Sequence, residues 1–197
     1  KVRHCTSDIH DPAPSDVYSI MPKNERQLWI GTLDGLETFD IATGRFIQTQ
    51  YNDSRTPRAS DVRTILSDSK GRLWTGGREG IICYQPTESG LKHLTPGTEL
   101  GELDDAFIHS IFESSTKHIW ISSRQGLYCF DDRNGRLTRY GAESGLPSDM
   151  IFGIEEDSFG RLWISTDNGI CCFNPFSSIC RNFSIADGLQ SNKFNPN

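Results

Sequence analysis

The stretch GRLWISTDNGICCFN, at residues 160–174, decides the fold because close copies of it occur three more times in the chain. The copies are RQLWIGTLDGLETFD at 26–40, GRLWTGGREGIICYQ at 71–85 and HIWISSRQGLYCFDD at 118–132. Their tryptophans lie 43 to 46 residues apart. A fixed period of this length is the signature of a repeat protein, so the fold of the whole chain follows from the fold of one unit.

Each unit keeps the same residue class at five positions. Glycine stands six residues after each tryptophan and an aromatic residue ten after it, while two aliphatic residues spaced V-x-x-I precede it. Short β-branched runs separated by Asp and Gly turns are typical of antiparallel strands, and no stretch shows a sustained helical period. We therefore predict four strands per unit and little helix; the fourth strand is the least regular, as at 45–51, 136–140 and 179–183.

Four strands in each repeat of this length predict an all-β propeller, in which four-stranded blades pack radially. The chain holds about four blades, which form part of a larger propeller. We assign residues 17–61, 62–107, 108–150 and 151–193 to these blades. Residues 1–16 are expected to supply the last strand and linker of a preceding blade. Residues 194–197 are expected to begin a fifth, since the segment at 144–151 recurs at 187–194.

Composition limits the function classes. The 197 residues carry a net charge of −6, which argues against nucleic acid as a partner because that affinity depends on Lys and Arg. No run of about 18 apolar residues is present, so we expect neither membrane contact nor a membrane span in this chain. The chain begins at Lys1 without a targeting segment, which suggests a piece of something longer.

The four repeats resemble the two-component regulator propeller repeats of periplasmic sensor regions in hybrid two-component systems of polysaccharide-degrading bacteria. The resemblance covers residues ~15–197 and rests on the combined V-x-x-I and G-x-L-W-I-G-T-x-x-G-L-x-x-F pattern, with DGLQSNKFN at 187–195 in support. It implies a periplasmic detector of glycan-derived oligosaccharides, in a protein anchored in the inner membrane. In that family a histidine kinase receives the signal and controls genes for polysaccharide utilisation.

Candidate ligand-binding residues lie in the two-residue tips between the second and third strands. In a propeller these tips emerge at one end together with the connections between blades, and loops on a rigid scaffold are where recognition usually occurs. Arginine there would suit a sugar carboxylate, because its guanidinium makes bidentate contacts. The candidates are Asp34, Arg78, Glu79, Arg124, Gln125, Asp167 and Asn168.

We expect no catalytic residue, no metal site and no cofactor. The five histidines are dispersed and no nucleophile, phosphate-loop or zinc motif occurs. In the run Glu155-Glu156-Asp157, Asp157 is interpreted as a turn residue and the glutamates as a solvated strand end. Cys83, Cys129 and Cys172 share one column and are interpreted as small buried side chains, while a Cys5–Cys180 pair stays open.

Two other function classes stay open: a propeller enzyme, such as a lyase or hydrolase, and a protein-interaction or dimerisation scaffold. The enzyme hypothesis would gain if His109 lay in a deep pocket beside acidic groups with a perturbed pKa.

The repeated tryptophan is interpreted as structural, because burying so large a ring favours folding by several kcal/mol, at ~25 cal/mol per Å². An incomplete ring leaves two terminal blade faces exposed, so we expect self-association through them.

Overall fold

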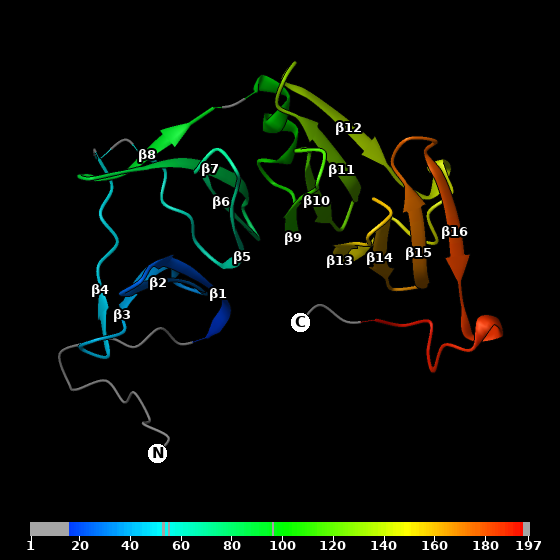
Figure 1. Ribbon diagram of the computed structural model, residues 1–197, viewed down its shortest axis with the longest axis horizontal. Helices are drawn as coiled ribbons and strands as arrows, with labels where there is room; N and C mark the ends of the chain where they lie inside the picture. Colours follow the sequence, from blue (N-terminus) through cyan, green and yellow to red (C-terminus); the bar gives the residue numbers. More distant parts are fainter. Residues whose placement is uncertain (1–15, 53, 55, 96, 195–197) are drawn as a thin grey trace.

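The computed structural model describes residues 16–52, 54, 56–95 and 97–194, which form four antiparallel sheets arranged in an open arc (Figure 1). The first blade contains β1 (Val17–Asn24), β2 (Gln27–Thr32), β3 (Gly35–Asp40) and β4 (Arg45–Ile47). The second contains β5 (Val62–Ser67), β6 (Leu73–Gly77), β7 (Gly80–Thr87) and β8 (Gly90–Leu94). The third contains β9 (Ile108–Glu113), β10 (Ile119–Ser123), β11 (Gly126–Asp131) and β12 (Arg136–Tyr140). The fourth contains β13 (Ile151–Glu156), β14 (Leu162–Thr166), β15 (Gly169–Asn174) and β16 (Ile179–Phe183).

Every blade is a simple meander in which consecutive strands pair. The first strands, β1, β5, β9 and β13, contact their counterparts in neighbouring blades and line the inner side of the arc (Figure 1). Among the described residues, helix is limited to three short 3₁₀ segments, η1 (Thr98–Leu103), η2 (Ala142–Ser144) and η3 (Ile185–Asp187). None of the helices in the described part of the chain is long and apolar enough to cross a bilayer. The predicted partial β-propeller of about four four-stranded blades is confirmed.

The fourth strand of the first blade is shorter than the sequence suggested. We expected it to reach Tyr51, but β4 ends at Ile47. The next residues pair with the second blade instead: Tyr51 forms an isolated parallel bridge with Leu91 of β8, and the Asn52 amide donates to the Leu91 carbonyl at 2.9 Å. The connection between the blades therefore satisfies its backbone hydrogen bonds across the seam.

The glycine six residues after each tryptophan is required by the tip that it closes. Gly80 has φ +95°, a conformation that other residues rarely adopt. A Cβ atom there would lie 2.3 Å from the carbonyl oxygen of Leu103, in the connection to the third blade. Gly35 packs likewise on the linking chain, whereas Gly126 and Gly169 pack on the carbonyls of Tyr140 and Phe183, at the ends of the fourth strands of their own blades. The repeated glycine thus lets each hairpin tip pack tightly against neighbouring backbone.

The repeated tryptophan fills the seams between blades. The Trp74 ring in the second blade packs 6.0 Å from that of Phe130 in the third, and the Trp120 ring lies 5.9 Å from that of Phe173 in the fourth. Trp29 lies in one buried cluster with Tyr84 of the second blade. In each seam the tryptophan of one blade therefore meets the aromatic column of the next.

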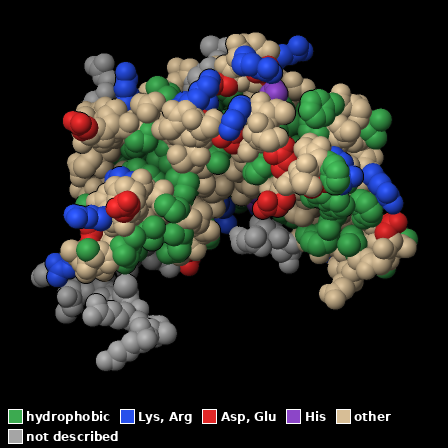
Figure 2. All heavy atoms as spheres, viewed as in Figure 1, with side chains coloured by type: hydrophobic (Ala, Val, Ile, Leu, Met, Phe, Trp, Pro, Cys, Tyr) green, Lys and Arg blue, Asp and Glu red, His purple; other side chains and the backbone are tan. Residues whose placement is uncertain are grey.

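The fourth tryptophan has no following blade to cover it. Trp163 is 37% exposed and stacks on Phe183 of its own blade. Figure 2 shows hydrophobic side chains on both sides of the opening, over β1–β4 and over β13–β16. Ile20 of the first blade and Ile179 of the fourth are among the large apolar residues left exposed. Self-association through these two faces stays a prediction.

The cysteines differ from the expectation in one respect. Cys171 and Cys180 form a disulfide between β15 and β16, with Cα atoms 5.9 Å apart. Phe173 of β15 pairs directly with Cys180 of β16, so Cys171, two residues before Phe173, is the diagonal neighbour of Cys180 on the same face of the sheet. The sequence alone did not reveal this register. Cys5 lies outside the described residues. Cys83 is buried, as expected, whereas Cys129 and Cys172 are only half-buried; all three are free.

Candidate functional site

The predicted tip residues lie at the end of the molecule where the blades are linked. In a four-stranded meander, the tip between the second and third strands lies at the same end as the connection to the neighbouring blade. Three hydrogen bonds between tips and connections illustrate this here. Leu33 O accepts from the amide of Asp61, and the Arg124 amide donates to Phe107 O. The Asn168 side chain donates to Pro147 O at 3.2 Å. All seven candidate side chains are exposed: Asp34, Arg78, Glu79, Arg124, Gln125, Asp167 and Asn168.

Two of the seven candidates converge on one aromatic ring. The Arg124 guanidinium lies 4.1 Å from the ring centre of Phe107, and that of Arg78 lies 5.9 Å from it. Arg63, from the inner strand β5, approaches the same ring at 5.1 Å and the Tyr18 ring at 4.3 Å. Three cationic groups from two blades therefore surround Phe107, which precedes the inner strand of the third blade.

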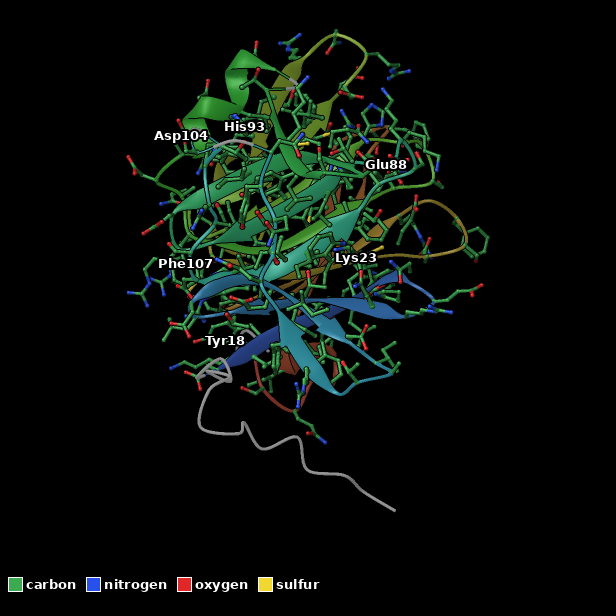
Figure 3. The ribbon with its side chains drawn as sticks, turned by 90° about the vertical axis from the view of Figure 1, so that its left-hand side faces the viewer. Tyr18, Lys23, Glu88, His93, Asp104 and Phe107 are labelled. Atoms are coloured by element: carbon green, nitrogen blue, oxygen red, sulfur yellow. A yellow bond between two sulfur atoms is a disulfide. The ribbon has the colours of Figure 1, made fainter. Side chains whose placement is uncertain are left out.

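An aromatic row continues from Phe107 along the inner strands. The His109 ring lies 4.8 Å from the Phe107 ring and 5.3 Å from that of Phe152. Figure 3 shows Tyr18 and Phe107 at the same end of the molecule, with Glu88 at the opposite end. We call this group the Phe107 cluster; its members are Tyr18, Asp61, Arg63, Arg78, Phe107, His109, Arg124 and Phe152.

A pattern in the sequence marks most of the cluster residues that were not among the predicted candidates. Tyr18, Arg63, His109 and Phe152 occupy one column, directly after the first aliphatic residue of each V-x-x-I motif. In each blade the first strand has a β-bulge at this column, and the bulge turns these side chains toward the inside of the arc. The four residue types differ, so the repeat pattern predicted no common binding role for this column. His109 alone was named, as a possible catalytic group. Phe107 lies outside the repeated columns.

The other five candidates do not join the cluster. Glu79 accepts a hydrogen bond from the Ser60 hydroxyl, and the Gln125 carbonyl accepts from Arg139 at 2.6 Å. Asp34 lies near Glu37 and, together with burial of Glu37, raises the pKa of that carboxyl. No interaction between Asp167 or Asn168 and the cluster exists within the described ranges. The rim of tips is therefore not uniform, and Arg78 and Arg124 are its distinctive members.

Asp61 holds two of the three arginines in place. Its carboxylate lies 3.1 Å from Nε of Arg63 and 3.0 Å from Nε of Arg78. Asp61 is buried and has φ +47°, a strained conformation of the kind that persists at functional sites. Its backbone also packs so closely on Gly77 that a Cβ atom there would lie 1.8 Å from the Asp61 carbonyl oxygen.

His109 is neutral over most of the pH range because of its surroundings. Burial, followed by the charges of Arg124 and Arg63, lowers its pKa to about 4. Its Nε2 atom is buried and has no hydrogen-bond partner among the described residues. The perturbed pKa expected of a catalytic histidine is present. The charged groups that shift it are arginines, however, and not the acidic neighbours that an acid–base pair needs.

A groove of about 680 Å³ adjoins the cluster. The inner-strand residues Tyr18, Arg63, His109 and Phe152 form one side of it. The other side is the open face of the fourth blade, which contributes Trp163 among others. This volume falls within the range of small-molecule sites and admits a ligand larger than one sugar ring.

The acidic residues Glu156 and Asp157 make structural hydrogen bonds. Within the described ranges no three His, Cys, Asp or Glu side chains gather as a metal site would require. Asp157 accepts the Phe159 amide at 2.9 Å and so acts as the predicted turn residue. Glu156 is not simply solvated, since it accepts the amide and hydroxyl of Ser115, both at 2.7 Å, from the preceding blade.

Comparison with known proteins defines the class. Residues 145–168 match the family described as two component regulator propeller. The extracellular domain of a putative hybrid two component system from B. thetaiotaomicron is 28% identical with a TM-score of 0.76, over 92% of this chain and 24% of that one. That of a putative one component system from the same organism is 22% identical with a TM-score of 0.72, over 95% of this chain and 26% of that one. No curated protein matches significantly.

A more distant structure shows the fold alone. Virginiamycin B lyase from Staphylococcus aureus is 14% identical with a TM-score of 0.59, over 87% of this chain and 57% of the lyase. The fold defines this protein as a partial β-propeller that is similar to extracellular domains of two component and one component systems. More particularly, residues 145–168 match the two component regulator propeller repeat, and the chain spans about a quarter of each of the two extracellular domains.

Proposed function

We propose that the chain is part of the periplasmic sensor region of a hybrid two-component regulator, and that it detects glycan-derived oligosaccharides. The observation that carries the proposal is the 28% identity to the extracellular domain of a putative hybrid two component system over 92% of the chain. In this proposal the chain performs no catalysis. The protein that contains it passes the signal to a histidine kinase, which controls genes for polysaccharide utilisation.

The Phe107 cluster is the part of the surface best suited to such a ligand. A sugar ring presents apolar C–H faces and a rim of hydroxyls, so it needs a flat aromatic surface and hydrogen-bond donors close together. Tyr18, Phe107 and Phe152 supply the aromatic faces. The arginines supply N–H donors, and the adjoining groove gives a longer ligand room to extend.

Calorimetry of the chain against a panel of oligosaccharides tests the proposal. We expect at least one to bind and Phe107→Ala to weaken that binding about tenfold, because a stacked ring contributes about 0.5–1.5 kcal/mol beyond its buried area. Phe159→Ala, which removes an exposed ring outside the cluster, is the matched control and should bind normally. Failure of every oligosaccharide to bind, or turnover of one of them, would contradict the sensor proposal.

The enzyme alternative is weaker on the present geometry. Its strongest support is the low pKa of His109, but that value follows from burial and two arginines. Glu155 lines the same groove as His109, but within the described residues no carboxylate bonds to the imidazole to orient it or share its proton. The dimerisation-scaffold alternative rests on the exposed apolar faces beside the opening, and one of them, the open face of the fourth blade, also forms one side of the groove.

A further inference from the structure

The Phe107 cluster contains more positive than negative charge. Three guanidinium groups face Phe107 or its neighbours, while Asp61 is the carboxylate bound among them. His109 adds no charge near neutral pH. A net positive site stands out in a chain whose total charge is −6. Such a local excess raises the concentration of anionic ligands around it.

Of the three arginines in the Phe107 cluster, Arg124 is the one without a carboxylate partner among the described residues. Arg63 and Arg78 both pair with Asp61, at 3.1 and 3.0 Å. Within the described residues Arg124 pairs with no carboxylate, and its guanidinium lies over the face of Phe107 at 4.1 Å. Its side chain is exposed at the tip between β10 and β11, so its N–H donors are available to a ligand lying beside the ring.

The arrangement is organised before any ligand arrives. Arg78 donates a hydrogen bond to Asp61, and Arg63 forms an ion pair with the same carboxylate. The Arg124 amide is bonded to the carbonyl of Phe107, the residue whose ring its side chain covers. Ordering long side chains normally opposes binding, so a site whose arginines are already held loses less entropy when a ligand binds. The unpartnered Nε2 atom of His109 lies buried beside them.

We infer that this site takes an acidic sugar: a carboxylate or sulfate group of a glycan fragment binds at Arg124, with Arg63 and Arg78 beside it, while the sugar ring lies against Phe107. The inference rests on the proposed function and names the chemical class of its ligand. Guanidinium groups pair with planar carboxylates and with sulfate-like oxyanions through two parallel N–H bonds. They repel cations and offer no acceptor to hydroxyl protons. A phosphodiester polymer would need a continuous basic stripe, which a chain of charge −6 does not favour.

Matched ligands separate the charge from the shape of the sugar. The chain is titrated in a calorimeter with an oligogalacturonide and its methyl ester, and with a sulfated carrageenan disaccharide and its desulfated form. Neutral cello-oligosaccharides complete the set. Each titration is run at low and at moderate salt, because exposed charge pairs are screened as ionic strength rises. The first pair of ligands tests a carboxylate source and the second a sulfate source.

Three variants locate the effect. We expect an acidic fragment to bind at least tenfold more tightly than its neutral partner, and Arg124→Gln to weaken binding of that fragment about tenfold to a hundredfold. Arg124→Lys keeps the charge but not the planar donor pair, so it should lose less. Arg45→Gln removes an exposed arginine on β4 of the first blade and should leave binding unchanged.

The outcomes distinguish this inference from the proposed function. Equal binding of acidic and neutral partners, or acidic binding that Arg124→Gln leaves intact, would overturn the acidic-ligand inference while the sensor proposal stands. Binding of neutral fragments alone would have the same meaning. If no fragment of either kind binds, the inference and the sensor proposal both fail.

Discussion

The seam between the second and third blades and the open face of the fourth blade contain the same local motif in two settings. In the second blade, Asp68 accepts the indole N–H of Trp74 at 2.8 Å and Nε of Arg72 at 2.6 Å. In the fourth, Asp157 accepts the corresponding donors of Trp163 and Arg161 at 3.0 and 2.7 Å. Yet Trp74 is fully buried, whereas Trp163 is 37% exposed.

The difference shows which interactions form within a single blade and which require the neighbouring blade. The Asp–Arg–Trp hydrogen bonds form within one hairpin and survive at the open face. Burial of the indole requires the aromatic column of the next blade, as Phe130 provides for Trp74. Arg72 also pairs across the seam with Asp132 at 2.7 Å, whereas the ion pair of Arg161 is with Asp157 of its own blade. Most of the stability should therefore reside in the seams.

The largest expected change in stability comes from truncating the two tryptophans to alanine. Trp74→Ala should lower the free energy of unfolding by about 3–5 kcal/mol, because it leaves a cavity in the seam. Trp163→Ala should lower it by less than half as much, since part of that ring is already in water. Urea unfolding of both variants measures the difference. Equal losses would show that the seam does not hold the blades together.

The second test removes the arginine of each motif. Arg72→Met leaves the buried Asp68 without its ion-pair partner and leaves Asp132 with Lys70 alone, so we expect a loss of about 3 kcal/mol. Arg161→Met removes a half-exposed pair, and surface pairs of this kind contribute about 0–1 kcal/mol. The same unfolding assay applies. A loss for Arg161→Met that matched Arg72→Met would contradict the importance of the cross-seam pair.

A smaller effect is expected in the third blade, where the turn departs from the repeat. Lys117 stands where Gly71 and Gly160 stand in the neighbouring blades, and it keeps their left-handed conformation at φ +68°. Lys117→Gly should raise the free energy of unfolding by about 1 kcal/mol, because the left-handed region is costly for a residue with a Cβ atom. Lys117→Ala is the control and should give no such gain; a gain from alanine would point to charge instead.

The last effect is seen only when the pH is lowered. The pKa of His109 in the folded chain, about 4, lies below its unfolded value near 6.5. Its contribution to stability is therefore complete above pH ~6.5 and is lost as the pH falls toward 4, because the unfolded chain then binds a proton that the folded one resists. His109→Gln should flatten the fall in unfolding midpoint between pH 6.5 and 4.5. An unchanged slope would mean that the histidine is solvated.

The repeat predicted the fold because its signals were local and repeated. The Trp, Gly and aromatic columns predicted the strands, the tips and their common end without any long-range information. The Cys171–Cys180 pair was missed because it depends on the register between β15 and β16, which no local pattern sets. The early end of β4 was missed for a similar reason, since residues near Tyr51 pair with the next blade.

The site could be predicted only in part. Position in the tips singled out Arg78 and Arg124, but it could not distinguish them from Asp167, which occupies the equivalent position, or from Asp34, the next residue of the first tip. What separates them is Phe107, whose ring brings the two arginines together and which lies outside the repeat pattern. The inner column shared by Tyr18, Arg63, His109 and Phe152 has no common residue type, so conservation within the repeat could not mark it.

One measurement tests the central claim, that ligand binds at the Phe107 cluster while Trp29, Trp74 and Trp120 only join the blades. The imidazole signals of His109 and the four indole N–H signals are followed by NMR as an acidic oligosaccharide is added. The account predicts that His109 shifts strongly and that its pKa rises above about 4, because an anion beside it favours the protonated form. The indole signals of Trp29, Trp74 and Trp120 should stay in place. Shifts of those indoles with an unmoved His109 would contradict it.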